Sequence, residues 1–427
     1  MDPVSLVVRM IAVGDELLEG RTADTNSRRI QRALGEHAVQ VAGIRVVPDT
    51  LAAVAEALDG TGEGDLVFLT GGLGSTPDDL TRDAVAAWAG LALDEDADVR
   101  AALEARWRAR GITHSPGVLR QCQVPAGFTA LANPVGSAPG LVGRARGRTC
   151  VLLPGVPAEL EGLLPLVLAR LDRDGVLPAA RATLLWRTSQ VAELRIVERC
   201  AAVRDAHPDL AWSWWLTEWG VDVRVGAEAA RADALAAAEA ALDPVLRPVT
   251  YARTMQTLPA VVQDLMIARG LTLATAESCT AGLIGGALTE EPGSSAFFRG
   301  GIIAYADEVK RAQLGVDADL LAAHGAVSEP VVQAMAAGAR ARLGADCAVA
   351  VSGIAGPGGG TPDKPVGTTW IAVATPDGAW ARRYRFPADR TRNRLLTVAA
   401  AIDGVRRAVL AGAGGSPWQG DDSWARP

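Results

Sequence analysis

The chain has 427 residues, too many for one ordinary hydrophobic core, so the sequence predicts two or three domains. Its apolar content of 49 % and charged content of 21 % are typical of a soluble globular protein, and a net charge of −7 argues against a large nucleic-acid-binding surface. The five scattered cysteines include no C-x-x-C pair, which argues against a zinc knuckle or a disulfide framework. No apolar run reaches the length of a membrane span, and a reducing cytoplasm is the expected compartment.

The first 170 residues alternate between apolar runs and amphipathic segments. This alternation predicts a mainly parallel sheet with ligands at the carboxyl ends of its strands. Two acidic, glycine-rich loops, 14–20 and 71–81, directly follow predicted strands, so they should share that edge. In chain order, the predicted elements are a strand at 6–13, a helix at 22–34, a strand at 39–47, a helix at 51–58, a strand at 65–70 and a helix to about 89.

These two loops carry the chemistry that the N-terminal region offers. Their glycines let backbone N–H groups approach an anion closely. Four carboxylates, Asp15, Glu16, Asp78 and Asp79, are suited to hold a hard divalent cation against a phosphate. The alternative is that Asp78 and Asp79 only favour the N-terminus of the next helix.

Residues 173–250 read as a small α+β module. Its tryptophan cluster, 212–219, is either a stacking platform for bases or, more commonly, buried core or a domain interface. Residues 244–257 are the best candidate for a linker. The predicted strands lie at 182–186, 209–216 and 220–226, and the predicted helices at 189–200 and 229–242.

The C-terminal region is organised around residues 274–282, which read Ala-Thr-Ala-Glu-Ser-Cys-Thr-Ala-Gly. A predicted strand precedes this stretch and a predicted helix follows it, so Ser278 and Cys279 should lie at a helix N-terminus. The N–H groups of a helix beginning at Cys279 would favour a phosphate or a developing oxyanion. The alternative is ordinary helix capping by Ser or Thr.

Only one histidine, His324, lies in this half, which argues against a Ser-His-Asp triad and a multi-histidine metal site. A serine nucleophile would then need a lysine base, and Lys310 lies in a mostly apolar segment, five residues after Tyr305. The alternatives are a solvated Lys310 and a Cys279 nucleophile paired with His324. A glycine loop at 353–360 and an arginine near the start of the last helix, at 390–410, are suited to a phosphate.

These motifs, in this order and spacing, resemble the CinA family (competence/damage-inducible protein A). The resemblance covers about 6–170 and 257–410. In the second span it is carried by Ala276-Glu-Ser-Cys-Thr, Gly293-Ser-Ser-Ala-Phe-Phe, Tyr305 with Lys310, His324-Gly-Ala-Val-Ser, Ser352-Gly-Ile-Ala-Gly-Pro and Lys364-Pro-Val-Gly-Thr. In the first span it is carried by Gly14-Asp-Glu-Leu-Leu, Gly71-Gly-Leu-Gly with Asp78-Asp-Leu-Thr, Asn133-Pro-Val-Gly with Ala138-Pro-Gly, and Leu153-Pro-Gly-Val-Pro.

The resemblance implies that residues 255–412 form an α/β amidase domain without a cofactor. Such a domain hydrolyses the carboxamide of nicotinamide mononucleotide to nicotinate mononucleotide and ammonia, a step of pyridine-nucleotide (NAD) salvage. Ser278 would be the nucleophile, Lys310 its base and Tyr305 an assisting hydroxyl. The substrate-binding residues assigned with them are Cys279, Thr280, Ser295, Gly353, Ala355, Gly356 and Arg390.

The resemblance also implies that residues 1–172 form a molybdopterin-binding-like, three-layer α/β domain. In the family this domain is associated with metal-dependent hydrolysis of ADP-ribose to AMP and ribose 5-phosphate. The carried-over residues are Gly14, Asn26, Gly71, Gly72 and Ser75 for the ligand, and Asp15, Glu16, Asp78 and Asp79 for a divalent metal.

The remaining expectations concern organisation and partners. The module at 173–250 looks KH-like, and 413–427 is expected to be a disordered tail. Small-molecule nucleotides and self-association into a homo-oligomer are expected, whereas membrane and nucleic-acid partners are not. A second hypothesis is a nucleotide-sensing or assembly protein of competence or DNA-damage responses that binds ligand without catalysis. Two departures from the family pattern are Ala281, in place of a glycine, and Ser75, in place of a proline.

Overall fold

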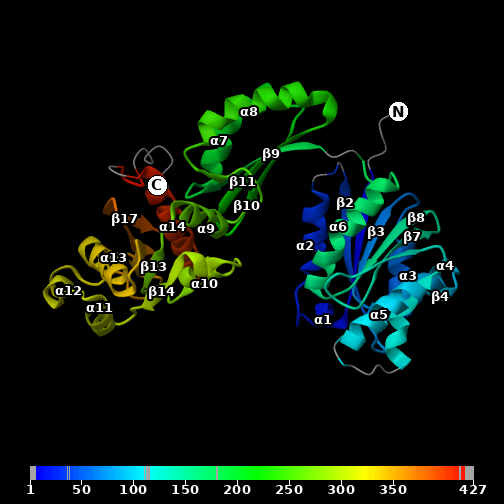
Figure 1. Cartoon of the computed structure of the whole chain (residues 1–427). Helices are drawn as coiled ribbons and strands as arrows, with labels where there is room; N and C mark the ends of the chain where they lie inside the picture. The colour runs from blue at the N-terminus through cyan, green and yellow to red at the C-terminus, as the bar shows by residue number, and fades with distance from the viewer. Residues whose placement is uncertain are drawn as a thin grey trace. The chain divides into compact units, whose positions relative to one another are not determined.

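The computed structural model describes residues 6–35, 37, 39–109, 111, 116–178, 181–412 and 415–418. It divides into two compact units, Met1–Arg181 and Ala182–Pro427, which we call the N-terminal unit and the C-terminal unit (Figure 1).

The N-terminal unit is built on one six-stranded sheet. Four of its strands are parallel: β1 (Val7–Val13), β2 (Gln40–Val47), β3 (Leu66–Thr70) and β8 (Arg148–Leu153). β7 (Gly140–Ala145) and β6 (Thr129–Leu131) extend the sheet antiparallel, which gives the order β2-β1-β3-β8-β7-β6. Every residue of β3 is buried, as expected for a central strand covered on both faces.

Helices cover both faces of this sheet. α3 (Leu51–Asp59) and α4 (Thr81–Ala89) pack through Leu58 and Val85 on one face, and α2 (Asn26–Leu34) and α6 (Pro157–Arg173) pack on the other. The predicted three-layer α/β domain is therefore confirmed. Smaller elements complete the unit: α1 (Asp15–Leu18), α5 (Ala97–Ala109), a 3-10 turn at Pro116–Cys122, and the paired β4 (Leu93–Glu95) and β5 (Gln123–Pro125).

The C-terminal unit begins with a four-stranded antiparallel sheet. Its order is β10-β11-β9-β12, and α7 (Glu193–Ala206) and α8 (Ala232–Leu246) pack on one face. The prediction of a linker at 244–257 is wrong, because α8 continues through Pro244 and β12 pairs with β9. Only residues 253–257 connect this sheet to the domain that follows. The strands are β9 (Ala182–Ser189), β10 (Ala211–Leu216), β11 (Gly220–Ala227) and β12 (Thr250–Ala252), and a 3-10 turn lies at Ala229–Arg231.

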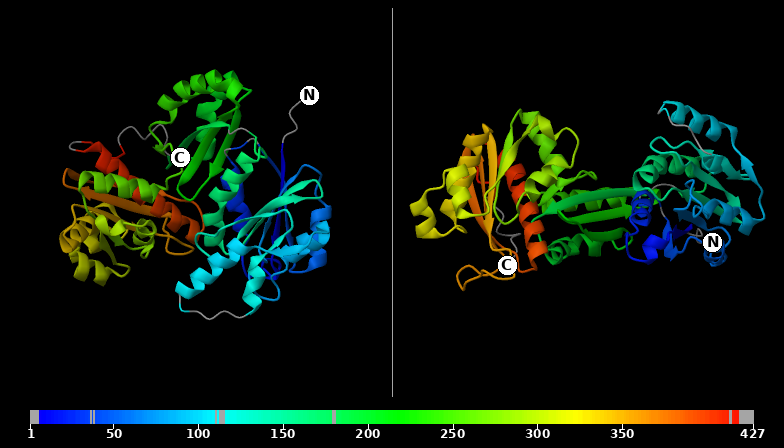
Figure 2. Two further views of the ribbon diagram at one scale, coloured as in Figure 1. Left: turned by 45° about the vertical axis from the view of Figure 1, so that its right-hand side comes forward. Right: turned by 90° about the horizontal axis from the view of Figure 1, so that it is seen from below.

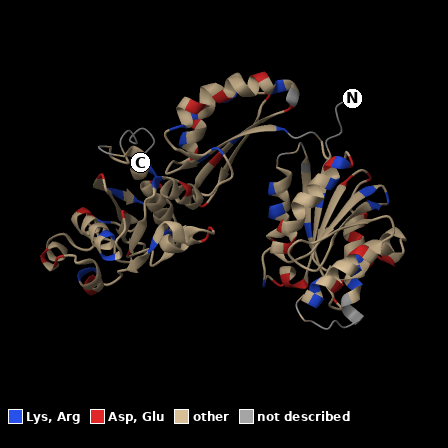
Figure 3. Ribbon diagram, in the orientation of Figure 1, with Lys and Arg blue, Asp and Glu red and all other residues tan. Residues whose placement is uncertain are grey.

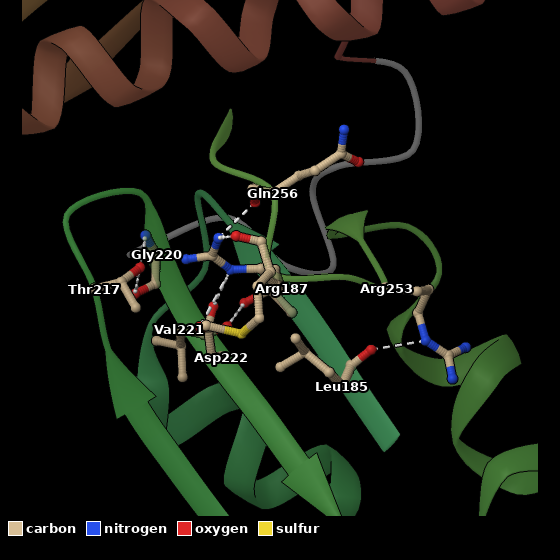
Figure 4. A network of polar contacts seen from close by, with 10 residues as sticks. Leu185, Arg187, Thr217, Gly220, Val221, Asp222, Arg253 and Gln256 are labelled. Carbon is tan, nitrogen blue, oxygen red and sulfur yellow. Dashed lines mark hydrogen bonds and ion pairs between the residues drawn. The ribbon is translucent and has the colours of Figure 1, made fainter. Parts of the chain in front are cut away.

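The other face of this small sheet carries a buried ion pair. Arg187 on β9 lies directly opposite Asp222 on β11, and its Nε donates to both carboxylate oxygens, at 3.0 and 3.2 Å (Figure 4). The same guanidinium donates to the carbonyls of Met255 and Gln256 and lies over the ring of Tyr251. One arginine therefore ties the small sheet to the segment that leads into the next domain.

The tryptophan cluster serves mainly as core and interface. Trp219 is 6 % exposed and belongs to the hydrophobic core of the following domain. Trp212 and Trp214 stack at 6.1 Å between ring centroids and pack against the core beneath α7 and α8. Trp215 is the exposed member, at 42 %, and its ring lies beneath the guanidinium of Arg224.

The second domain of the C-terminal unit is a five-stranded sheet between two helical layers (Figure 2). α9 (Leu258–Arg269), α10 (Leu283–Thr289) and α14 (Arg390–Ala411) cover one face, and α11 (Asp307–Leu314), α12 (Ala318–His324) and α13 (Glu329–Leu343) cover the other. The order is β14 (Phe298–Ile303), β13 (Leu273–Glu277), β15 (Cys347–Gly353), β16 (Thr368–Thr375) and β17 (Gly378–Arg385), with the first three strands parallel.

The prediction of a disordered tail at 413–427 falls mostly on residues that the structure does not describe. Within 415–418, the ring of Trp418 packs against the core of the C-terminal unit. Among the described residues, no helix is long and apolar enough to cross a bilayer. Figure 3 shows Lys and Arg interspersed with Asp and Glu over the elements of both units.

Candidate active site

The end of β13 contains a buried carboxylate, Glu277, which is 1 % exposed. Its two oxygens accept four hydrogen bonds: from the hydroxyl of Thr280 (2.7 Å) and from the N–H groups of Gly282 (2.8 Å), Ile284 (3.1 Å) and Gly285 (2.8 Å). Helix α10 begins at Leu283, so the prediction of a helix that begins at Cys279 is wrong. The protein's own carboxylate, rather than a ligand, occupies the N-terminus of this helix.

Residues 280–283 form a tight turn between the nucleophile candidate and α10. The N–H of Leu283 donates to the carbonyl of Thr280 at 3.3 Å. Both central residues, Ala281 (φ 51°) and Gly282 (φ 96°), have the left-handed backbone typical of a type I′ turn. Glycine adopts this conformation without strain, whereas alanine does not. The departure at Ala281 therefore has a conformational cost.

We expect Ala281→Gly to raise the free energy of unfolding of the C-terminal unit by about 1 kcal/mol, because it removes the strained left-handed alanine. The matched control is Gly282→Ala, which should destabilise the unit. It places an alanine at a positive φ, and its Cβ would lie 3.2 Å from Cδ1 of Ile303. Differential scanning calorimetry measures both. An unchanged or lower transition temperature for Ala281→Gly would contradict the assignment of strain.

The strand register places Ser278 next to the end of β14. The N–H of Ser278 donates to the carbonyl of Val351 on β15, at 3.1 Å, and the N–H of Ala304 donates to the carbonyl of Glu277, at 2.8 Å. Ser278 therefore leaves β13 at the carboxyl edge of the parallel strands, beside the segment that leads to Tyr305. Its side chain is nearly buried, at 8 % exposure.

Lys310 is buried, at 1 % exposure, although α11 is a surface helix. Its ammonium donates to the carbonyl of Tyr305 at 2.9 Å and to Oδ1 of Asp307 at 3.0 Å. The alternative of a solvated lysine is therefore wrong. The expectation of apolar surroundings is also incomplete, because the amine has a backbone carbonyl and a carboxylate as hydrogen-bond acceptors.

The first turn of α14 contacts the other predicted site residues. Arg390 donates to the carbonyl of Gly356 at 2.8 Å and to the hydroxyl of Tyr305 at 3.4 Å. Asn393, which is buried, donates to the carbonyl of Ala355 at 3.0 Å. Gly353 ends β15 at the start of the same glycine loop.

Arg394 reaches the loop that carries the nucleophile candidate. It donates through Nε to the carbonyl of Cys279 (3.0 Å) and through Nη2 to the carbonyl of Thr280 (2.8 Å). The start of α14 thus contacts Cys279 and Thr280 through Arg394, and Gly356 and Tyr305 through Arg390. Ser295 lies exposed in a 3-10 turn at Ser294–Ala296, and among the described residues no hydrogen bond joins it to this group.

Sequence reasoning missed three residues of this arrangement: Glu277, Asn393 and Arg394. A signal for Glu277 was present, because a charged residue at the end of an otherwise apolar buried strand needs a partner. Asn393 and Arg394 gave no such signal, since polar residues in the first turn of a helix are common.

Cys279 is a poor rival nucleophile. The thiol is buried, and burial raises its pKa to about 11. His324 ends α12, and its backbone carbonyl accepts a hydrogen bond from Lys364 at 2.8 Å. Within the described residues, no hydrogen bond joins the ring of His324 to Cys279.

Because the thiolate is the reactive form, we expect Cys279 to resist iodoacetamide at pH 8 in the folded protein. A thiol with an ordinary pKa of about 8.5 would be partly ionised at that pH, whereas one with a pKa of about 11 stays protonated, and its reactivity should rise only towards pH 11. Peptide mass spectrometry measures the labelling, with urea-unfolded protein as the control. Rapid modification at pH 8 would restore Cys279 as a candidate.

In the N-terminal unit, the loops after β1, β3 and β8 meet at one edge. Gly71 has φ 94°, and a side chain there would lie 2.2 Å from the carbonyl oxygen of Val13, so only glycine fits. The Cα of Gly71 also contacts Gly155, whose carbonyl accepts a hydrogen bond from the amide of Asn26 at 2.7 Å. Of the predicted residues, Gly14 and Gly71 therefore lie on adjoining loops, and Asn26, the first residue of α2, contacts the loop after β8.

The four predicted carboxylates at this edge do not share one role. Asp79 holds its own loop, since it accepts hydrogen bonds from the N–H groups of Gly74 (2.8 Å) and Thr76 (2.7 Å), on either side of Ser75. Gly72 packs against the side chain of Thr81 at the start of α4. Asp15, Glu16 and Asp78 are exposed.

A further acid, Asp49, escaped sequence reasoning. It follows β2 on the same edge and accepts a hydrogen bond from the N–H of Asp15 at 2.9 Å. Burial raises the pKa of Asp49, and the charges of Asp15, Glu16 and Asp78 add to that rise, against the opposing effect of the hydrogen bond. The charges of these three carboxylates therefore act on Asp49, whereas a hydrogen bond from the side chain of Thr76 lowers the pKa of Asp78. Among the described residues, however, no three His, Cys, Asp or Glu side chains gather closely enough to hold a metal ion by themselves.

A pocket of about 350 Å³ lies in the same unit, between α5 and the loop that begins at Asn133. Arg106 of α5 donates to backbone carbonyls of this loop, and Asn133 donates to Glu159 on α6 at 2.9 Å. Asn133 and Arg106 therefore fix the wall of the pocket.

The fold and the site define a class: a two-unit α/β protein in which each unit presents polar loops at the carboxyl edge of parallel strands. Residues 9–173 match the family model "Probable molybdopterin binding domain", and residues 255–409 match the "CinA C-terminal domain".

The chain is 42 % identical over 422 residues to a CinA-like protein of Gemmatimonas aurantiaca, covering 95 % of this chain and 97 % of that protein. It is 41 % identical to a CinA-like protein of Frankia casuarinae, covering 94 % and 96 %. A solved structure, competence damage-inducible protein A from Klebsiella pneumoniae, is 40 % identical, covers 36 % of this chain and 95 % of its own, and has a TM-score of 0.35. The chain belongs to the CinA family.

Proposed function

We propose that the C-terminal unit is a nicotinamide-nucleotide amidase, which hydrolyses nicotinamide mononucleotide to nicotinate mononucleotide and ammonia. The observation that supports this most is the buried Lys310, whose ammonium donates to the carbonyl of Tyr305, two residues after β14, while Ser278 directly follows β13, the strand that pairs with β14. A buried amine on a segment next to that of a nearly buried serine suits a Ser-Lys hydrolase, although among the described residues no hydrogen bond joins the two side chains.

In this proposal the neutral amine of Lys310 takes the proton of Ser278 while Oγ bonds to the carboxamide carbon. The π electrons of the carbonyl move to its oxygen, and the resulting oxyanion is stabilised by the N–H of Cys279. When the tetrahedral intermediate collapses, the C–N bond breaks and the nitrogen leaves as ammonia with a proton from the lysine. Water then hydrolyses the ester by the same steps.

The nucleotide's phosphate would lie at the 353–360 glycine loop. Arg390 is proposed as the second phosphate-binding group. It donates hydrogen bonds to the carbonyl of Gly356 and the hydroxyl of Tyr305, so it links the glycine loop to the reacting groups. Ser295 is proposed as a further contact, from the 3-10 turn before β14.

The test is ammonia release from nicotinamide mononucleotide, compared with nicotinamide riboside, which lacks the phosphate. Turnover of the mononucleotide and a large preference over the riboside would support both the reaction and the phosphate site. Saturable binding without ammonia would contradict the proposal and favour a nucleotide-sensing or assembly protein of competence or DNA-damage responses; one relative and one solved structure carry competence-damage-inducible names.

For the N-terminal unit we propose hydrolysis of ADP-ribose to AMP and ribose 5-phosphate. The supporting observation is the group of carboxylates around Asp49, whose negative charges a bound cation would offset. A magnesium-like ion is commonly held by one or two carboxylates together with substrate phosphates, so Asp15, Glu16 and Asp78 suit such an ion when the substrate supplies the remaining oxygens. That ion would neutralise charge on the pyrophosphate.

This second activity is tested by AMP formation from ADP-ribose in the presence of Mg²⁺, Mn²⁺ or Co²⁺, with EDTA as the control. Binding of ADP-ribose without AMP formation under every metal would leave a binding domain and contradict the proposal. The two tests are independent, because the sites lie in separate units.

A further inference from the structure

The loop that carries Ser278 is held from outside by one side chain, Arg394 of α14. Its guanidinium spans two consecutive carbonyls, those of Cys279 and Thr280, at 3.0 and 2.8 Å. A planar guanidinium with two donors on neighbouring carbonyls fixes both peptide planes at once. The contact crosses 115 residues of sequence, so it is a feature of the tertiary fold.

Each peptide group that follows Ser278 is thereby fixed at its carbonyl. The carbonyl of Ser278 accepts a hydrogen bond from the N–H of Ala281 at 3.1 Å, and those of Cys279 and Thr280 accept from Arg394. In a trans peptide, the N–H points opposite to the carbonyl. The hydrogen bond from Ala281 to the carbonyl of Ser278 therefore directs the N–H of Cys279, and Arg394 directs the N–H groups of Thr280 and Ala281. Among the described residues, no hydrogen bond joins the N–H of Cys279 or Thr280 to another residue.

Glu277 binds backbone N–H groups of this loop, whereas Arg394 binds its carbonyls. Glu277 takes the N–H groups of Gly282, Ile284 and Gly285, so those donors are not available to a substrate. The donors that remain nearest the nucleophile are those of Cys279 and Thr280, and Cys279 is the more accessible of the two, at 6 % against 0 % exposure. A charged donor on a carbonyl also polarises the peptide group, so Arg394 strengthens the N–H groups of Thr280 and Ala281 as donors, and that of Ala281 holds the carbonyl of Ser278, whose peptide carries the N–H of Cys279.

We propose that Arg394 is a positioning residue for the amidase reaction: it orients the turn that carries Ser278 and the N–H of Cys279, and so sets the site that stabilises the oxyanion. Arg394 does not itself touch the substrate. The inference rests on the proposed Ser278 chemistry, although not on the identity of the substrate.

The test uses the full chain with Arg394→Ala, Arg394→Lys and the control Arg392→Ala. Arg392 lies on the same helix turn, and among the described residues its side chain has no hydrogen-bond or ion-pair partner. Two rates are measured: turnover of nicotinamide mononucleotide, and labelling by a fluorophosphonate. In the labelling step, Oγ of Ser278 bonds to phosphorus, fluoride leaves, the hydroxyl proton passes to the base, and the phosphonyl oxygen takes the place of the oxyanion.

For Arg394→Ala we expect kcat and the labelling rate to fall together by about 100-fold, with KM nearly unchanged, because the loss concerns the transition state. Added guanidinium ion should restore part of both rates. Arg394→Lys should be intermediate, since an ammonium lacks the paired donors, and Arg392→Ala should retain both rates.

Three results would overturn the inference. The first is a raised KM with unchanged labelling, which would make Arg394 a contact of the substrate's phosphate. The second is a loss that accompanies a lower transition temperature and is not rescued by guanidinium, which would make its role purely structural. The third is unchanged rates.

The wild-type protein distinguishes failure of this inference from failure of the proposed substrate. If it is labelled at Ser278 but does not turn over the mononucleotide, the proposed substrate fails, while the labelling rates still decide the role of Arg394. If Ser278 is not labelled at all, both proposals fail.

Discussion

Replacement of Ser278 by alanine and, separately, of Lys310 by methionine should each lower ammonia release from nicotinamide mononucleotide by at least about 10³-fold. Such a loss corresponds to roughly 4 kcal/mol of transition-state stabilisation. The serine variant removes the atom that bonds to the substrate. Methionine fills nearly the same volume as the buried Lys310 but cannot accept a proton, so it separates loss of the base from loss of packing.

The chain provides a matched control, because Lys364 is its only other lysine. Lys364 donates to a backbone carbonyl, that of His324, and Lys364→Met should leave the rate within about threefold of wild type. Calorimetry of each variant shows whether the fold persists. A well-folded Lys310→Met protein with wild-type turnover would exclude the lysine as the base, and a fully active Ser278→Ala protein would exclude the serine nucleophile.

The second large effect is on stability. Asp222→Asn should lower the free energy of unfolding of the C-terminal unit by about 3–5 kcal/mol, because it leaves the guanidinium of Arg187 buried without its countercharge. The side chains of this pair are only 7 % and 3 % exposed, so water cannot replace the lost partner. At about 2–4 °C per kcal/mol for a unit of this size, the transition temperature should fall by about 10 °C.

The companion variant is the double replacement Arg187→Met with Asp222→Leu. Since an apolar pair avoids the desolvation of both charges, it should cost much less than Asp222→Asn alone. The transition of the N-terminal unit is the internal reference in the same calorimetric scan, because the substitutions lie in the other unit. Equal costs for the single and double replacements would show that the connections of Arg187 to Met255 and Gln256, rather than its charge pair, determine the stability.

Regular elements with strong periodicity could be predicted from the sequence almost to the residue. The helix predicted at 51–58 and the strand predicted at 65–70 agree with α3 and β3 to within one residue, because a threonine N-cap and a following glycine mark the helix and an apolar run marks the strand. The linker at 244–257 was a wrong prediction, since prolines are read as breaks, whereas Pro244 is accommodated within α8 and a short strand follows at 250–252.

The site was only partly predictable, because its key properties depend on tertiary contacts. The burial of Lys310 comes from the packing of α11 on the sheet, which a single helix turn does not indicate. The start of α10 is shifted to Leu283 by Glu277, whose role depends on the turn that Ala281 and Gly282 form. Asp49 gave no signal of its own because its neighbours, Asp15 and Glu16, are distant in sequence and meet it only through the parallel pairing of β1 and β2.

The indole of Trp219 and the ring of Tyr251 lie in the same core as Leu258 and Val262, although they precede the span 255–409 that defines the second domain by sequence. A fragment beginning at residue 255 lacks Trp219 and Tyr251, so it would expose the apolar side chains of α9 that pack against them and would be prone to aggregate. A fragment beginning at residue 182 keeps these side chains buried. Expression trials of the isolated second domain should therefore start at the earlier boundary, and the fluorescence of Trp219 would report separation of the small antiparallel sheet from this domain.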